Sequence, residues 1–180
     1  VKKVSYLDAM GWNMPHTVRE MITAMREKYP QIETYHMHLH NTRGATIASC
    51  YEALQLGATE FDTSLGGMGG CPYCGNGRAA GHVPTEDLVH MCHQMGIETG
   101  YDLDKVIDAA CVAEDVVGHP LKGHVSKAGA LPDAEHCYPA DMPFVETLGE
   151  AAHFRQGPSV YEGQISPWRD RDALTQPSAA

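Results

Sequence analysis

Residues 35–41 read Tyr35-His36-Met37-His38-Leu39-His40-Asn41, a run in which histidine takes every second position. A period of two is typical of a β-strand, where alternate side chains point to the same face of the sheet. We therefore expect His36, His38 and His40 to share one face while the apolar residues between them pack on the other. Three imidazoles at this spacing favour a metal site over histidines that merely occupy polar positions in a core.

Segments with strand-like and helix-like patterns alternate on both sides of this run. The expected strands span about 4–8, 33–40, 58–64 and 79–83. The expected helices span about 16–28, 47–56, 86–95 and 103–117, the second ending at Gly57 and the third capped by Thr85. Alternation of this kind predicts an α/β fold with a parallel sheet.

Polar residues stand at the predicted carboxyl ends of the strands, namely Asp8, His38, His40, Asn41, Ser64 and His82. Function at this end of parallel strands is typical of a TIM (β/α)8 barrel. A closed barrel needs eight strand–helix units in about 250 residues, whereas this chain has about four. We therefore expect half a barrel in residues 1–127, followed by an irregular extension rich in proline and glycine in residues 128–180. The start at Val1 rather than methionine fits a fragment or a processed chain.

The composition argues against several classes of function. With 43% hydrophobic and 20% charged residues, the chain has the make-up of a soluble globular protein. A net charge of -10, with 13 lysine and arginine residues spread along the chain, argues against nucleic-acid binding. No apolar run approaches the roughly 20 residues of a membrane helix, and no signal peptide is recognisable. Six cysteines are too few for a disulfide scaffold, so we expect free thiols and a cytoplasmic location. A homo-oligomer is also expected.

Two segments resemble those of one enzyme family. The run Ser64-Leu65-Gly66-Gly67-Met68-Gly69-Gly70-Cys71-Pro72-Tyr73 resembles the signature loop of 3-hydroxy-3-methylglutaryl-CoA (HMG-CoA) lyases. The run His38-Leu39-His40-Asn41-Thr42-Arg43-Gly44 resembles the metal strand of the wider DRE-TIM metallolyases, which also include isopropylmalate and citramalate synthases. The resemblance covers about residues 4–110 and includes the segments 85–89 and 96–100 that follow the loop.

The resemblance implies a TIM barrel that this chain enters at the fifth strand, so that Asp8, the paired histidines, Asp62 and His82 lie on strands five to eight. In the family the ion is Mg2+ or Mn2+, bound by the paired histidines, an aspartate of strand one and an asparagine of strand eight; Zn2+ is not excluded. The strand-one aspartate has no counterpart here, and His82 stands in the place of the asparagine. His38, His40 and His82 are thus the expected ligands, with His36 deeper in the barrel as a supporting group.

The implied reaction is the retro-Claisen cleavage of a 3-hydroxyacyl-CoA, either HMG-CoA or a relative such as citramalyl-CoA. A divalent ion acidifies the hydroxyl group, a base removes its proton, and an acid returns a proton to the thioester enolate. The mobile catalytic cysteine of the family corresponds to Cys71, and His38 corresponds to the histidine implicated in proton transfer. The residues expected beside the substrate are Asp8, Asn41, Arg43 and Asp62, and further candidates for phosphate contacts are Arg78, Lys122, His124 and Lys127.

Three alternative functions and one regulatory feature stay open. The run Arg78-Ala79-Ala80-Gly81 partly matches the synthases, which would run the reaction towards condensation. The run Cys71-Pro72-Tyr73-Cys74 has the frame of a thiol–disulfide oxidoreductase, although the glycines after it disfavour the helix that such a site needs. A regulatory disulfide between these two cysteines is also open. The non-enzymatic alternative is a structural zinc site, with ligands drawn from Cys71, Cys74, His82, His90, Cys92 and His93. The missing half-barrel would come from the same chain or from a second one.

Overall fold

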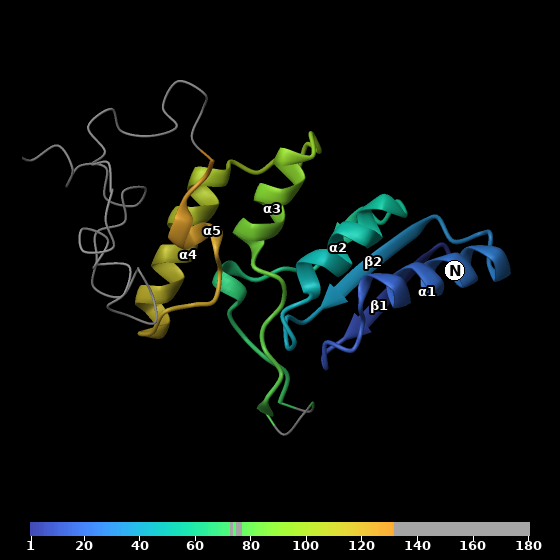
Figure 1. The fold of residues 1–180 in the computed structure, drawn as a ribbon, viewed down its shortest axis with the longest axis horizontal. Coiled ribbons are helices and arrows are strands. Elements are labelled where there is room, and N and C mark those ends of the chain that lie inside the picture. Colours follow the sequence, from blue (N-terminus) through green and yellow to red (C-terminus); the bar gives the residue numbers. More distant parts are fainter. Residues whose placement is uncertain (73, 75–76, 132–180) are drawn as a thin grey trace, which may run out of the picture. The chain divides into compact units, whose positions relative to one another are not determined.

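The computed structural model describes residues 1–72, 74 and 77–131 (Figure 1). Its elements are β1 (Lys3–Asp8), α1 (Pro15–Lys28), β2 (Thr34–Leu39), α2 (Thr46–Gln55), β3 (Glu60–Phe61), the 3-10 helix η1 (Leu65–Gly67), α3 (Thr85–Gln94), α4 (Leu103–Val117) and α5 (Val125–Ala128). By its internal contacts the chain divides into two units, Val1–Ser126 and Lys127–Ala180. Most of the predicted extension lies outside the described residues.

The three strands form one parallel sheet in the order β1-β2-β3. Helices α1 and α2 connect them and lie along the sheet, as Figure 1 shows. In the register of the sheet, Ser5 pairs with His36 and Leu7 pairs with His38. The predicted α/β class is therefore confirmed, and the histidine strand is the central strand of the three.

The apolar residues of β2 form the centre of the core. Tyr35, Met37 and Leu39 are 4%, 1% and 2% exposed, and they pack with Val18 and Ile22 of α1 and with side chains of α2. Burial of a large apolar side chain contributes roughly 1.5–3 kcal/mol. A shift of the strand by one residue would turn the histidines into this core, so the burial sets the register. The alternation predicted for the strand is confirmed.

The opposite face of the sheet, which carries the histidines, is open on β1. Leu7, the register partner of His38, is 65% exposed there, and Ser5 is exposed on the same face. Among the described residues, no strand pairs with the outer edge of β1. In a closed barrel this face is the packed interior and the sheet has no free edge. The sheet therefore has the form of an incomplete barrel wall.

Two of the predicted strands differ from the structure. The strand expected over 58–64 is reduced to Glu60–Phe61, and the segment 79–83 forms no strand. That segment instead makes an isolated antiparallel bridge between His40 and His82, and Asn41 N donates to the carbonyl of Gly81 at 2.8 Å. The physical reason is that the segment meets its neighbours only at single bridges of opposite direction, His40 with His82 and Ser64 with Pro84, so no continuous ladder forms.

The helices agree closely with the ranges predicted from the sequence, apart from the N-cap residue of α3. Helix α4 spans the predicted residues, and Gly57 follows α2 with a positive φ of 77°, as expected for a helix end. Thr85 is not the cap of α3, because Pro84 holds that position and the Thr85 hydroxyl donates to Thr63 Oγ1 at 2.8 Å. No helix in the described part of the chain combines the length and the apolar character that crossing a membrane requires.

Candidate metal centre

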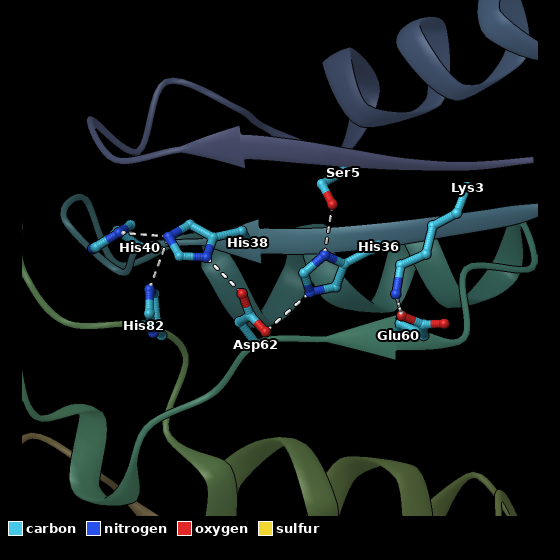
Figure 2. A network of polar contacts seen from close by, with 8 residues as sticks. All are labelled: Lys3, Ser5, His36, His38, His40, Glu60, Asp62 and His82. Carbon is cyan, nitrogen blue, oxygen red and sulfur yellow. Dashed lines mark hydrogen bonds and ion pairs between the residues drawn. The ribbon is translucent and has the colours of Figure 1, made fainter. Parts of the chain in front are cut away.

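Three imidazoles meet at the carboxyl end of β2. His38 is on the strand, His40 follows its last residue, and His82 comes from the extended segment before α3 (Figure 2). The Nε2 atom of His38 lies 3.2 Å from Nε2 of His40 and 3.1 Å from Nε2 of His82. Within the described residues this is the one group of three or more histidine, cysteine or acidic side chains close enough to share an ion. We call it the histidine cluster.

The hydrogen bonds at the far side of two rings show which nitrogens face the centre of the cluster. Nδ1 of His40 lies 2.7 Å from the carbonyl oxygen of Ala80, and Nδ1 of His38 lies 2.6 Å from Asp62 Oδ2. A carbonyl or a carboxylate only accepts hydrogen bonds, so each Nδ1 carries the proton. In the neutral imidazoles, the Nε2 lone pairs of His38 and His40 therefore face one another with no hydrogen between them.

A divalent ion fits this arrangement. Facing lone pairs repel one another unless a cation lies between them, and neutral imidazole nitrogen is a common metal ligand. Neighbouring ligand atoms around an ion with bonds of about 2.1 Å lie about 3.0 Å apart in octahedral geometry and about 3.4 Å apart in tetrahedral geometry. The observed separations of 3.2 and 3.1 Å lie within this interval. The donor set and the two separations from His38 Nε2 therefore suit a metal centre.

The pKa values of His82 and Asp62 are both lowered, which favours binding of a cation at the cluster. Burial lowers the pKa of His82, and the neighbouring His40 and His38 lower it further, against an opposing effect of Asp62. A lowered pKa leaves this imidazole neutral at neutral pH, which is the form that binds a metal. Hydrogen bonds from His38 and, to a lesser degree, His36 lower the pKa of Asp62, although burial opposes them. Asp62 therefore stays a carboxylate beside the cluster.

His36 lies deeper along the strand and does not join the cluster. Its Nε2 atom is 2.9 Å from Asp62 Oδ1, and its Nδ1 atom is 2.8 Å from the Ser5 hydroxyl (Figure 2). Asp62 thus contacts both histidines with its two oxygens, which is a different use of the carboxylate from the predicted contact with substrate. The pattern of the sequence did not reveal this link, because Asp62 is 24 residues from His38.

Three other predicted substrate residues contact the backbone of nearby loops. Asp8 is buried, and its carboxylate accepts hydrogen bonds from Met10 N at 3.0 Å and from Asn13 N at 2.9 Å. Burial raises the pKa of Asp8, but the hydrogen bonds together outweigh it and lower the pKa overall. Arg43 donates to the carbonyl of Met10, and Asn41 accepts a hydrogen bond of 3.4 Å from Thr46 N. Asp8 and Arg43 therefore stabilise the turn after β1, and their contact with substrate stays a prediction.

The two cysteines of the glycine-rich segment form a tight turn. Cys74 N donates to the carbonyl of Cys71 at 3.3 Å, and both side chains are partly exposed. A hydrogen bond with the Cys71 side chain, followed by burial, raises the pKa of the Cys74 thiol. The side chain of Cys71 is therefore partly exposed, and these contacts do not test its predicted catalytic role.

The predicted basic residues separate into two groups. Arg78 and Lys122 line one cavity of about 490 Å3, together with glycines of the loop and with His119. His124 instead pairs with Asp87, at 3.1 Å between Nδ1 and Oδ2. His119 was not predicted from the sequence, although its position directly after the helix-ending Gly118 places it in a loop. The cavity is lined by two cationic side chains, which suit an anionic ligand.

The alternative zinc site does not form among the described residues. Cys92 is buried in the core, and His93 lies 2.9 Å from the Thr99 hydroxyl. Neither joins the two loop cysteines in a group that could share an ion.

A parallel strand–helix wall with a candidate metal site at the carboxyl ends of its strands has the form of a partial α/β barrel of the metal-dependent type. Comparison of the sequence with known families is consistent with this class. The HMGL-like family profile matches residues 1–113, and the chain belongs to that family.

Individual relatives agree with the family. The chain is 38% identical over 124 residues to the (R)-citramalyl-CoA lyase of Chloroflexus aurantiacus, covering 69% of this chain and 38% of that protein. It is 38% identical over 121 residues to a hydroxymethylglutaryl-CoA lyase of Bacillus subtilis, covering 67% and 40%. A solved HMG-CoA lyase from Acinetobacter baumannii, in complex with coenzyme A and 3-methylmalate, matches with a TM-score of 0.67 and 34% identity over 77% of this chain and 44% of its own. The chain spans about two fifths of the length of these relatives.

Proposed function

We propose that this chain provides the metal-binding half of a carbon–carbon lyase that cleaves a 3-hydroxyacyl-CoA by retro-Claisen chemistry. The observation that carries the proposal is the histidine cluster at the carboxyl ends of the strands, in a chain of the HMGL-like family. The names of the relatives support two substrates, HMG-CoA and citramalyl-CoA.

His38, His40 and His82 would hold the ion. When bound, a divalent ion acidifies the substrate hydroxyl and neutralises the alkoxide that develops there. Imidazole donors suit Mn2+ and Zn2+ better than Mg2+, which prefers oxygen ligands. We therefore favour Mn2+ or Zn2+ over Mg2+ for this chain.

The hydrogen bonds of the cluster help to assign metal binding and proton transfer to different residues. Asp62 holds the Nδ1 proton of His38, and the Nε2 atom of His38 faces the centre of the cluster, so neither nitrogen is left for proton transfer. Cys71 is the better candidate for the acid that protonates the enolate carbon, because it corresponds to the catalytic cysteine of the family and its side chain is partly exposed. We assign His38 to metal binding and Cys71 to proton transfer.

The cavity between the loop and the segment after α4 would receive the anionic part of the thioester. Arg78 and Lys122 line it, and phosphate groups are bound by such cations together with backbone N–H groups. Replacing both residues with alanine should raise KM for an acyl-CoA while leaving turnover at saturation largely intact, because the change lies outside the histidine cluster.

The direct test of the function is an assay for carbon–carbon cleavage. This chain together with the complementary half-barrel, in one polypeptide or as two, would be loaded with Mn2+ and incubated with HMG-CoA and with citramalyl-CoA, and release of acetyl-CoA would be followed by liquid chromatography. Cleavage of either substrate supports the proposal and identifies the acyl group. Absence of acetyl-CoA from both substrates, in a protein that binds the metal, would overturn it.

A further inference from the structure

The histidine cluster is connected to β1 by a chain of polar contacts. It runs from the Ser5 hydroxyl to His36 Nδ1 at 2.8 Å, from His36 Nε2 to Asp62 Oδ1 at 2.9 Å, and from Asp62 Oδ2 to His38 Nδ1 at 2.6 Å (Figure 2). Three elements take part, because Ser5 is on β1, the histidines are on β2, and Asp62 follows β3.

The contacts have a consistent direction when both imidazoles are neutral. The carboxylate of Asp62 only accepts, so His36 Nε2 and His38 Nδ1 each carry a hydrogen. His36 Nδ1 is then an acceptor, and the Ser5 hydroxyl is free to donate to it. Every donor meets an acceptor, and the chain ends with the bare Nε2 of His38 facing the centre of the cluster.

The carboxylate of Asp62 needs a second contact to fix its orientation, because its side chain is partly exposed to water. Its backbone N–H donates to the carbonyl of Met37 at 2.9 Å, but its side chain is 44% exposed, so water competes for its oxygens. A carboxylate held by a single contact can rotate about its side-chain bonds. A second contact at the other oxygen fixes both the plane of the carboxylate and the direction of Oδ2.

We propose that His36 is a positioning residue for the metal centre: by holding Oδ1 of Asp62, it aims Oδ2 at His38 and keeps the metal-facing nitrogen of His38 free of hydrogen. This inference rests on the proposed metal centre and adds a residue that does not itself bind the ion. Hydrogen bonds behind a ligating histidine set its tautomer and its orientation, and their loss typically costs about 10–100-fold in metal affinity.

The test compares variants of His36 in the protein that is used for the cleavage assay. His36→Gln keeps an N–H group that reaches Asp62, whereas His36→Asn is too short to reach it and His36→Leu has no donor. The matched control is Lys3→Met, which removes the exposed pair of Lys3 with Glu60 between the same strands without touching Asp62. Zn2+ and Mn2+ affinities would be measured by calorimetry, and the His38 tautomer of the metal-free protein by nitrogen-15 NMR.

We expect His36→Leu and His36→Asn to lose about tenfold or more in affinity, and His38 to populate the tautomer with hydrogen on Nε2. The metal affinities of His36→Gln and Lys3→Met should stay within about threefold of the affinity of the parent protein. If His36→Leu fails to fold, the comparison of His36→Asn with His36→Gln decides. Equal affinity and an unchanged His38 tautomer in His36→Asn would overturn the inference. Failure of the parent protein to bind either metal would instead overturn the proposed centre itself.

Discussion

At the scale of single residues, the third imidazole distinguishes this centre from the ligand set that the family resemblance implies. His82 replaces an amide oxygen with a ring nitrogen, and its Nε2 atom lies 3.1 Å from that of His38. Nitrogen donors move the preference of a site away from Mg2+ and towards transition metals. The identity of one residue is therefore expected to alter which metal the protein takes up.

We predict that His82→Asn lowers the affinity for Zn2+ by more than about tenfold and affects Mg2+ binding much less, because one imidazole donor is exchanged for oxygen. The measurement is calorimetric titration of the metal-free protein with each ion. His16→Asn, at an exposed position on α1, is the matched control and should bind as the parent does. An unchanged Zn2+ affinity in His82→Asn would show that this residue is not a ligand.

At the scale of elements, the segment before α3 contributes more to the metal centre than any helix does, because it brings His82 to the end of β2. Gly81 makes this approach possible. A Cβ atom at that position would lie 2.2 Å from the carbonyl oxygens of both Gly67 and Met68, a distance that no backbone tolerates without shifting. The absence of a side chain thus has a direct consequence for the metal centre.

Gly81→Ala is expected to push the segment away from the loop and to remove His82 from the cluster. Metal affinity should fall by more than about tenfold, while helical content by circular dichroism changes little. Gly96→Ala is a control for backbone strain alone, since Gly96, unlike Gly81, has a positive φ and nothing lies near its Cβ position. It should lose about 1 kcal/mol of stability and keep its metal. Full metal affinity in Gly81→Ala would contradict this account.

The first turn of α3 contains a buried acid that makes stability depend on pH. Glu86 is 0% exposed, and its Oε2 atom accepts a hydrogen bond of 3.0 Å from Gly66 N. Burial raises the pKa of Glu86 above its usual value of 4.5. The folded state therefore binds this proton more readily than the unfolded state, so the contribution is most favourable below the unfolded pKa and is lost as the pH rises towards the folded pKa.

Glu86→Gln should remove this dependence, because the amide cannot ionise. We expect the free energy of unfolding of the variant, relative to the parent protein, to increase between about pH 4.5 and pH 7. Urea denaturation at the two pH values provides the measurement. Glu20→Gln, which changes an exposed acid on α1, should show no such difference. A constant difference between Glu86→Gln and the parent across this range would be inconsistent with a raised pKa.

At the scale of the whole molecule, the open face of the sheet supports the prediction that a further part of a barrel covers it. Leu7 is exposed on the face that forms the interior of a closed barrel, and the outer edge of β1 is unpaired in the described part of the chain. The complementary half would supply the remaining strands and the oxygen ligand that the resemblance implies. It would be part of a longer chain or a separate one.

We predict that the 180-residue chain alone releases little acetyl-CoA from a hydroxyacyl-CoA, and that adding a half-barrel with strands one to four restores activity. Leu7→Glu should prevent this restoration, because a buried unpaired charge at the new interface is strongly unfavourable. Val116→Glu, at an 81% exposed position on α4, is the control that should be restored normally. Robust turnover by the chain alone would show that no second half is required.

Sequence and structure contributed differently to this centre. The period of two in residues 35–41 determined that His38 and His40 share a face, because a strand has no other way to present alternate residues. The same local rules placed the helices and the resemblance identified the family. Local pattern also produced errors: the strand expected over 58–64 is shorter, the strand over 79–83 is absent, and Thr85 is not the cap of α3. Pairing with distant segments decides these details, and a short stretch of residues does not show it.

Only the tertiary structure decided what surrounds the paired histidines. His82 is 44 residues from His38 along the chain, and Asp62 is 24 residues away, yet both contact the same ring. The structure also showed that His36 acts on the opposite oxygen of Asp62 rather than beside the cluster. Contacts between distant residues depend on how strands align and how closely backbones approach, as at Gly81, and no local periodicity carries that information.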